Sequence, residues 1–325
     1  MGLFACPLQG YFQEVLAMSM TDEERVAEFK QRIKKGQKVE AGDWMPDAYR
    51  ATLIKFIERH AMSELMGALP ERGWIPRAPT LQRKLAVISK VQDEVGHAQL
   101  LLRLVEDLGK PREQVMQDLF DGKAKFHNIF HYPLDTWGEM SVFVWWADSA
   151  SLITQSAIRR ASYAPYSRVM TKICWEEAFH LKHGEDMVLT LAMGTERQRA
   201  MVQEAINRWW EPIMMFFGPA TPAEKDDAIQ WGIKSKPNEE MRQEWLSKYV
   251  RKIRELGLTI PDPRLRFDEE SGLWEYSEPD MKKLLTVVTG HGPASRQRLG
   301  FRYLTYEECE WVRRAILAEP AAVVA

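Results

Sequence analysis

Two stretches of the chain, KVQDEVGHAQL (90–100) and KICWEEAFHLKHG (172–184), share the order acid-Glu-x-x-His. Both lie in segments whose apolar residues recur at intervals of three and four, which is the spacing of an amphipathic helix. Residues three apart on a helix differ by about 60° in direction and about 4.5 Å along the axis, so a Glu and its His can bind one metal ion. The sequence therefore predicts two ligand-bearing helices, and the alternative for each motif is a Glu–His pair on a helix surface. Their ligands are Glu94 with His97, and Glu177 with His180.

One further carboxylate precedes each motif by the length of a helical hairpin. Glu64 stands 30 residues before Glu94, and Asp148 stands 29 residues before Glu177. The chain thus contains a pseudo-repeat of a carboxylate helix followed by a Glu-x-x-His helix. That is the ligand arrangement of di-iron carboxylate four-helix bundles. Four carboxylates and two imidazoles suit non-haem iron or manganese, whereas zinc prefers four ligands richer in nitrogen or sulfur.

Asp148 lies in the apolar stretch SVFVWWADSASLI (141–153). An unpaired buried carboxylate costs several kcal/mol, so Asp148 is expected to bind a metal ion, to be protonated, or to pair with a buried Arg or Lys. Glu64 is a less distinctive candidate ligand. The alternative to metal binding is that it is a solvated residue on a helix surface.

Three residues next to the predicted ligands are candidates for a supporting role. Asp93 and Glu176 are placed to bond the far nitrogen of a ligand histidine across the bundle. The alternative for each is an ordinary charge on a helix surface. Lys90 lies one turn before Glu94. It is expected to direct its ammonium group to solvent, with pairing to a site carboxylate as the alternative.

The organisation along the chain is predicted to be all-α. Residues 1–20 form an N-terminal extension and 21–45 a leader. A four-helix bundle spans 46–217, and a C-terminal extension with a linker, helices and a small hairpin near 264–276 spans 218–325. Helices are expected at about 46–66, 79–108, 111–120, 134–161, 165–193, from 195 to 217, and 237–256. In the helix at 79–108, the recurring apolar residues are Leu81, Leu85, Ile88, Val91, Val95, Ala98, Leu102 and Val105.

Composition excludes several classes of protein. The 325 residues carry 44 Lys+Arg and 46 Asp+Glu, for a net charge of −2, which argues against a nucleic-acid partner. No stretch reaches the roughly 18 apolar residues of a membrane helix. The three cysteines are far apart and in no CxxC pair, which is typical of a reducing cytoplasm and predicts a cytoplasmic protein.

Five segments together resemble the catalytic A subunits of the multicomponent phenylacetyl-CoA epoxidases of aerobic phenylacetate breakdown. They are DWMPDAYR (43–50), KVQDEVGHAQL (90–100), WWADSASLITQ (145–155), KICWEEAFHLKHG (172–184) and INRWWEPIMMFFGP (206–219). The resemblance runs from about residue 21 to the C-terminus. The chain departs from the family pattern in the first 20 residues and after about residue 290.

The resemblance implies a ferritin-like bundle with two irons. Glu64 and Asp148 would be terminal ligands, Glu94 and Glu177 bridging ligands, and His97 and His180 one imidazole for each iron. The implied reaction uses O₂ and two electrons to convert the ring of phenylacetyl-CoA to a 1,2-epoxide and water. The implied partners are a non-catalytic C-type helical subunit, a small bridging subunit, and a flavin and iron–sulfur reductase that takes electrons from NADPH.

A CoA thioester requires cations for its phosphates and an apolar tunnel for its acyl part. Lys55 and Arg59, one turn apart on the first long helix, are one candidate pair for the phosphates. Each candidate is equally typical of an exposed helix face or an ordinary core position. The other candidates are Lys125, Phe126, His127, Asn128, Met215 and Lys234.

The sequence is compatible with other functions. A related substrate such as benzoyl-CoA fits the same motifs. Iron storage or ferroxidase activity is usual in much shorter chains, and the six intact ligands argue against a metal-free scaffold protein. For a radical-generating role, a tyrosine would have to lie close to the irons, and no such tyrosine is expected on the ligand helices beside a metal-binding position.

Overall fold

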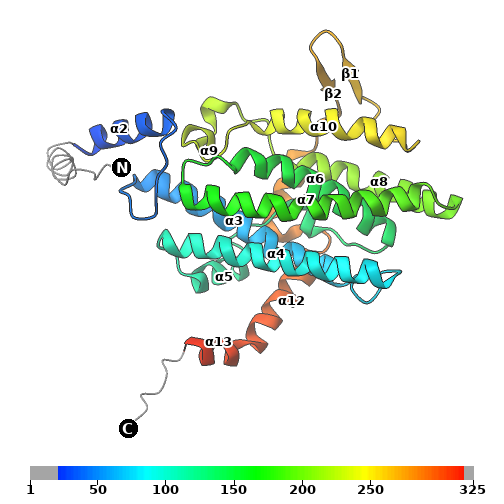
Figure 1. The fold of residues 1–325 in the computed structure, drawn as a ribbon, viewed down its shortest axis with the longest axis horizontal. Coiled ribbons are helices and arrows are strands. Elements are labelled where there is room, and N and C mark those ends of the chain that lie inside the picture. The colour runs from blue at the N-terminus through cyan, green and yellow to red at the C-terminus, as the bar shows by residue number, and fades with distance from the viewer. Residues whose placement is uncertain (1–20, 318–325) are drawn as a thin grey trace, which may run out of the picture.

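A computed structural model describes residues 21–317 of the chain. The predicted extension at 1–20 lies outside the described residues. Within them, the all-α prediction is confirmed, because β1 (Arg266–Asp268) and β2 (Leu273–Glu275) are the only strands, paired as a small antiparallel hairpin that projects from the helical body (Figure 1).

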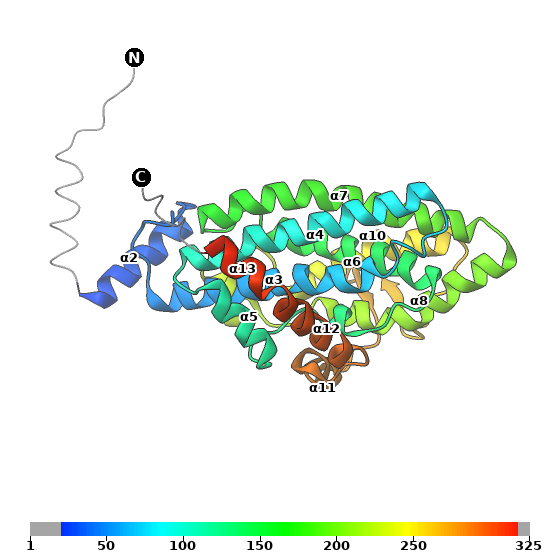
Figure 2. The same cartoon turned by 90° about the horizontal axis from the view of Figure 1, so that it is seen from below.

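Four long helices form the bundle that carries the predicted motifs. They are α3 (Asp47–Arg72), α4 (Leu81–Asp107), α6 (Trp137–Ile158) and α7 (Ala164–Ala192). α3 packs against α4 and α6 against α7, and α4 and α7 also touch, so the two hairpins close into one bundle (Figure 2). The pseudo-repeat in the sequence is therefore a repeat of two packed helical hairpins.

α6 lies at the centre of the bundle, and its sequence is accordingly apolar on nearly every side. Thr136 and Glu139 form a capping box that starts the helix. Gly184 of α7 lies so close to α6 that an added Cβ would sit 2.5 Å from the backbone nitrogen of Trp145. A residue larger than glycine would force the two helices apart. This close contact brings α6, which carries Asp148, against α7, which carries Glu177 and His180.

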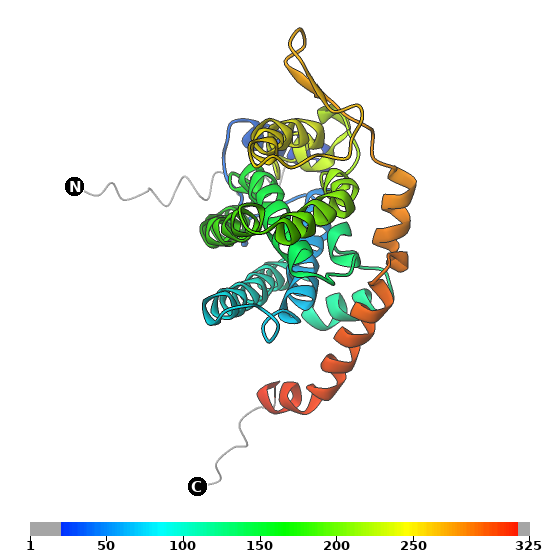
Figure 3. The same cartoon turned by 90° about the vertical axis from the view of Figure 1, so that its right-hand side faces the viewer.

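Other helices cover the bundle on several sides. α8 (Glu196–Phe216) and α10 (Asn238–Glu255) pack on α6. The C-terminal helices follow one side of the bundle in an arc (Figure 3). The remaining elements are α2 (Asp22–Lys34), α5 (Arg112–Phe120), η1 (Asn128–His131), η2 (Ala223–Lys225), α9 (Asp227–Gln230), α11 (Met281–Thr286), η3 (Val287–His291), α12 (Ser295–Glu308) and α13 (Glu310–Leu317).

Arg298 and Arg302 join α12 to the bundle. Arg298 donates hydrogen bonds to the backbone carbonyls of Phe130 and Tyr132, and Arg302 donates to the carbonyl of Leu65 at 2.8 Å. The C-terminal region thereby holds the segment that precedes α6. Within residues 21–317, no helix is both long enough and apolar enough to cross a membrane.

Two details of the helix predictions are wrong. α3 does not end before Pro70 but continues to Arg72, because the extra turn buries Glu71, whose carboxylate lies 3.4 Å from the Lys90 ammonium. The apolar repeat of α4 is only partly a core repeat. Leu81, Leu85, Ile88 and Val95 of that repeat are exposed. Helical spacing shows that residues share a face, but it does not show which face is buried.

Candidate metal centre

Six buried side chains converge between the four bundle helices. α3 supplies Glu64, α4 supplies Glu94 and His97, α6 supplies Asp148, and α7 supplies Glu177 and His180. Their potential ligand atoms form two groups, each within 4.8 Å. The groups are Glu64, Glu94, His97 and Glu177, and Asp148, Glu177 and His180.

Two of the carboxylates lie between the two imidazoles. Glu177 presents Oε1 to Nδ1 of His97 at 3.8 Å and Oε2 to Nδ1 of His180 at 3.4 Å. Glu94, which belongs to the first group, also has Oε1 3.6 Å from Nδ1 of His180. The imidazole ring centroids are 6.2 Å apart. The arrangement is that of two adjacent cation positions with shared carboxylates.

Each histidine is held from the opposite helix. Nε2 of His97 on α4 donates to Glu176 on α7 at 2.9 Å, and Nε2 of His180 on α7 donates to Asp93 on α4 at 3.0 Å. A carboxylate only accepts here, so the proton lies on Nε2 in both rings. Neither Nδ1 atom has a hydrogen-bond partner among the described residues. Two buried imidazole nitrogens that have no such partner and that face carboxylates are available to bind metal ions.

Lys90 is also inside this cluster. Its side chain is only 3% exposed, and its ammonium lies 3.1 Å from Asp148 and 3.4 Å from Glu71, and pairs with Glu94. The expectation that Lys90 points to solvent is therefore wrong. Burial lowers the pKa of Lys90, but the surrounding carboxylates outweigh burial and raise it well above its ordinary value.

The cluster holds more carboxylate than this one lysine can neutralise. Burial raises the pKa of Asp148 to about 7, although Lys90 acts to lower it. Three carboxylate oxygens, one each on Glu71, Asp148 and Glu177, have no hydrogen-bond partner within residues 21–317. Buried oxygens without partners are costly unless a cation binds them. The donor set therefore fits a pair of divalent metal ions.

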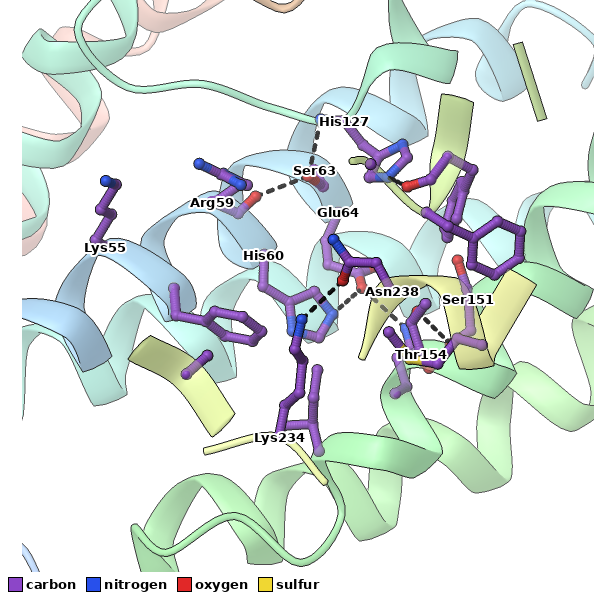
Figure 4. Close-up of a pocket in the computed structure, with 18 of the residues that line it drawn as sticks. Lys55, Arg59, His60, Ser63, Glu64, His127, Ser151, Thr154, Lys234 and Asn238 are labelled. Atoms are coloured by element: carbon purple, nitrogen blue, oxygen red, sulfur yellow. Dashed lines mark hydrogen bonds and ion pairs between the residues drawn. The ribbon is translucent and has the colours of Figure 1, made fainter. Parts of the chain in front are cut away.

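A cavity of about 660 Å³ reaches this cluster. Its walls include the carboxylates Glu64, Glu94, Asp148 and Glu177 and the aromatic residues Phe56, Phe130, Phe216 and Phe217. Figure 4 shows Lys55 and Arg59 on α3 beside the same cavity as Glu64. This volume is within the range of small-molecule sites, about 300–1,000 Å³.

The cavity brings together only part of the predicted substrate-contact set. Lys55, Arg59, His127 and Lys234 line it, but the ammonium of Lys234 is already paired with Asp226 at 2.7 Å. The other four residues are not in its wall. Phe126 stacks on His131 with ring centroids 3.8 Å apart, Asn128 donates to the carbonyl of Pro212, Met215 is buried in the interior, and Lys125 is partly exposed.

Sequence reasoning missed Glu71, Gln155, His60 and Tyr166. Glu71 and Gln155 lie seven residues after Glu64 and Asp148, two helical turns along the same face, which is a signal that the sequence did contain. Gln155 directs its amide nitrogen toward Glu64 at 3.5 Å and Glu177 at 3.4 Å. No sequence spacing connects Tyr166 to His60, because they lie 106 residues apart.

Fold and site together define a helical-bundle protein with a buried carboxylate–histidine cluster suited to metal. A family model described as phenylacetic acid catabolic protein matches residues 18–311. The chain is 45% identical over 301 residues to the A subunit of 1,2-phenylacetyl-CoA epoxidase from Escherichia coli (strain K12), a match that covers 92% of this chain and 96% of that protein. The chain belongs to the phenylacetic acid catabolic protein family.

Proposed function

We propose that this chain is the oxygenase subunit of a multicomponent di-iron monooxygenase that epoxidises the aromatic ring of phenylacetyl-CoA at the 1,2 position. The observation that carries the proposal is the buried set of four carboxylates and two imidazoles, with both Nδ1 atoms facing inward. The relative named as the A subunit of such an epoxidase, at 45% identity, supports the choice of substrate and reaction.

The six donors divide naturally between two irons. Glu64 and Asp148 would each bind one iron as terminal ligands, Glu94 and Glu177 would lie between the irons, and His97 and His180 would supply one nitrogen each. Iron bound there supplies the activation of O₂ with two electrons and two protons, so that one oxygen atom enters the ring and the other leaves as water. Asp93 and Glu176 keep the imidazoles in the tautomer that leaves Nδ1 free.

The cavity would receive the acyl end of the substrate. Phe130, Phe216 and Phe217 offer apolar surface for an aromatic ring near the carboxylates and displace water from it. Lys55 and Arg59 would contact the phosphates of CoA. Arg59 lies five residues before Glu64 on the same helix, about 7.5 Å along the axis. Lys234 is a weaker candidate, because Asp226 already neutralises its charge.

The proposed assembly includes further proteins. The name of the relative describes one component of a complex, which implies others. For this chain we propose a C-type helical subunit, a small bridging subunit, and a flavin and iron–sulfur reductase that passes electrons from NADPH.

Reconstitution tests the proposal. Iron-loaded chain, its partner proteins, the reductase, NADPH and O₂ are incubated with phenylacetyl-CoA, and the CoA esters are analysed by mass spectrometry. We expect a product with one added oxygen atom, and none when His97→Ala replaces the wild type. A parallel incubation with benzoyl-CoA tests the closest alternative. Oxygenation of benzoyl-CoA alone would replace the substrate assignment, and oxygenation of neither would overturn the proposal.

A further inference from the structure

A buried tyrosine and a histidine reach Glu64 from outside the six-ligand set. The hydroxyl of Tyr166, on α7, lies 2.9 Å from Nδ1 of His60, on α3. Nε2 of the same imidazole lies 2.8 Å from Oε1 of Glu64, one turn further along α3 (Figure 4). Tyr166 is fully buried, whereas His60 is part of the cavity wall.

The protons in this chain of hydrogen bonds follow from the groups involved. The Glu64 carboxylate accepts, so the proton between His60 and Glu64 belongs to Nε2 whichever protonation state the ring has. In a neutral ring, Nδ1 then carries a lone pair, and the phenol of Tyr166 donates to it. Burial raises the pKa of this phenol well above its ordinary value, so it remains protonated.

One oxygen of Glu64 is thereby occupied and the other is directed to the cluster. Oε1 receives the Nε2 proton of His60, and the Gln155 amide approaches the same oxygen at 3.5 Å. Oε2 lies 3.5 Å from Nδ1 of His97, the nitrogen for which residues 21–317 supply no hydrogen-bond partner.

The other terminal carboxylate is held in the same way. Oδ1 of Asp148 accepts from Lys90 at 3.1 Å, while Oδ2 has no partner among the described residues. In both halves of the bundle, one oxygen is engaged by the protein and one remains for a metal ion. His60 in one half therefore corresponds to Lys90 in the other.

We infer that Tyr166 and His60 are positioning residues that hold Glu64 so that it binds its metal ion through Oε2 alone. The inference rests on the proposed function, because it requires a metal ion at Glu64. It assigns His60 the role of hydrogen-bond donor and Tyr166 the role of orienting that donor. Neither residue needs to contact metal or substrate for this purpose.

Metal titration of the full-length apo-protein tests the inference without turnover. Co²⁺ serves as the probe, because the intensity of its visible absorption falls as its coordination number rises. His60→Leu removes the donor, so Glu64 is free to bind the metal ion through both oxygens, which raises the coordination number. We expect Co²⁺ binding about 10- to 100-fold weaker, with weaker visible absorption. Tyr166→Phe leaves the cavity wall intact and should weaken binding a few-fold with a smaller change in the same direction.

Two further variants separate positioning from packing. His60→Gln retains an N–H donor that reaches a Glu four residues later on a helix, so it should restore affinity and absorption close to those of the wild type. Tyr163→Phe is the matched control, because Tyr163 is equally buried and its hydroxyl has no partner within residues 21–317. Circular dichroism and thermal unfolding verify that each variant is folded.

The outcomes are distinct. Wild-type affinity and absorption in folded His60→Leu and Tyr166→Phe proteins would overturn the inference, and so would a His60→Gln protein that behaves like His60→Leu. If His60→Leu does not fold, the comparison of Tyr166→Phe with His60→Gln still tests the inference. A wild-type protein that binds no Co²⁺ would instead overturn the metal centre itself, and with it the proposed function.

Discussion

His97 on α4 donates its Nε2 proton to Glu176 on α7 across 2.9 Å, so the helix that carries one candidate ligand glutamate also orients the histidine of the other helix. The reciprocal bond joins His180 to Asp93 at 3.0 Å. Each acid-Glu-x-x-His motif is thus completed by the first acid of the other motif. The two halves of the centre therefore depend on each other for their geometry.

This exchange predicts a loss of metal affinity when either supporting acid is removed. Glu176→Ala and Asp93→Ala should each weaken metal binding about 10- to 100-fold, because the imidazole loses the acceptor that fixes its tautomer. Titration with Co²⁺ measures the effect. Asp186→Ala is the control, since Asp186 lies on the same helix as Glu176 but pairs with Lys182. Equal affinity in all three variants would contradict the prediction.

The six-ligand set predicts about two irons per fully loaded chain. His97→Ala and His180→Ala should leave helical content unchanged and reduce iron content sharply, because each removes the nitrogen of one iron. Iron analysis with circular dichroism measures both quantities. Full iron content in both variants would refute the ligand assignment.

Because Lys90 is buried among carboxylates, we expect its removal to change the unfolding free energy of the apo-protein more than that of the metal-loaded protein. Lys90→Met removes the cation that Glu71, Glu94 and Asp148 share. The apo-protein should lose about 3–5 kcal/mol of unfolding free energy, because buried carboxylates lose their partner. Bound Co²⁺ should recover most of the loss by replacing the missing charge. Urea unfolding with and without Co²⁺ measures both effects. Lys182→Met changes an exposed lysine and should alter the unfolding free energy of neither state. A Lys90→Met apo-protein as stable as wild type would contradict the prediction.

If Lys55 and Arg59 bind the CoA phosphates, their removal should change the Michaelis constant for the acyl-CoA in a salt-dependent way. Neither side chain takes part in an ion pair of 4.0 Å or less among residues 21–317, so both charges are available to CoA phosphates. Changing both to Ala should raise the Michaelis constant for the acyl-CoA at low salt while iron content stays constant. The difference should shrink as salt rises, because screening already weakens the wild type.

The control for that variant is Lys248→Ala with Arg251→Ala on α10, where both side chains pair with glutamates. If the Lys55 and Arg59 variant has a wild-type Michaelis constant at low salt, the two residues are an ordinary solvated helix face.

Because His131 is buried, we expect the protein to lose stability in mild acid. Burial lowers the pKa of His131 to about 4, so the folded state binds this proton less readily than the unfolded state does. Between pH 7 and pH 5 the unfolded state gains the proton first, and the unfolding free energy should fall by about 2 kcal/mol from this group.

Urea unfolding of wild type and His131→Gln at both pH values isolates the contribution, because glutamine does not titrate. Nδ1 of His131 lies 2.7 Å from the hydroxyl of Ser295 on α12. An equal pH dependence in the two proteins would contradict the prediction.

The bundle and its six candidate ligands could be derived from the chain alone, for a local reason. Glu94 and His97 are three residues apart, and helix geometry alone puts them side by side. The spacing of 29 to 30 residues from each isolated carboxylate is the length of one helical hairpin, so Glu64 and Asp148 could also be identified. Residues such as Met215 and Lys125 could not be assigned, because an apolar or basic residue in a helix or loop carries no information about which cavity it faces.

Spacing within one helix was therefore enough to derive the helices, their approximate ends, and the pairs of donors that share a face. Relations between helices emerged only from their packing in three dimensions. Packing placed Lys90 among carboxylates instead of in solvent, because α3 and α6 bring Glu71 and Asp148 to it. Packing also joined Tyr166 to His60. It kept four of the eight residues of the α4 apolar repeat exposed. Helical periodicity defines directions around one axis, whereas the partner that each direction meets depends on how the helices pack.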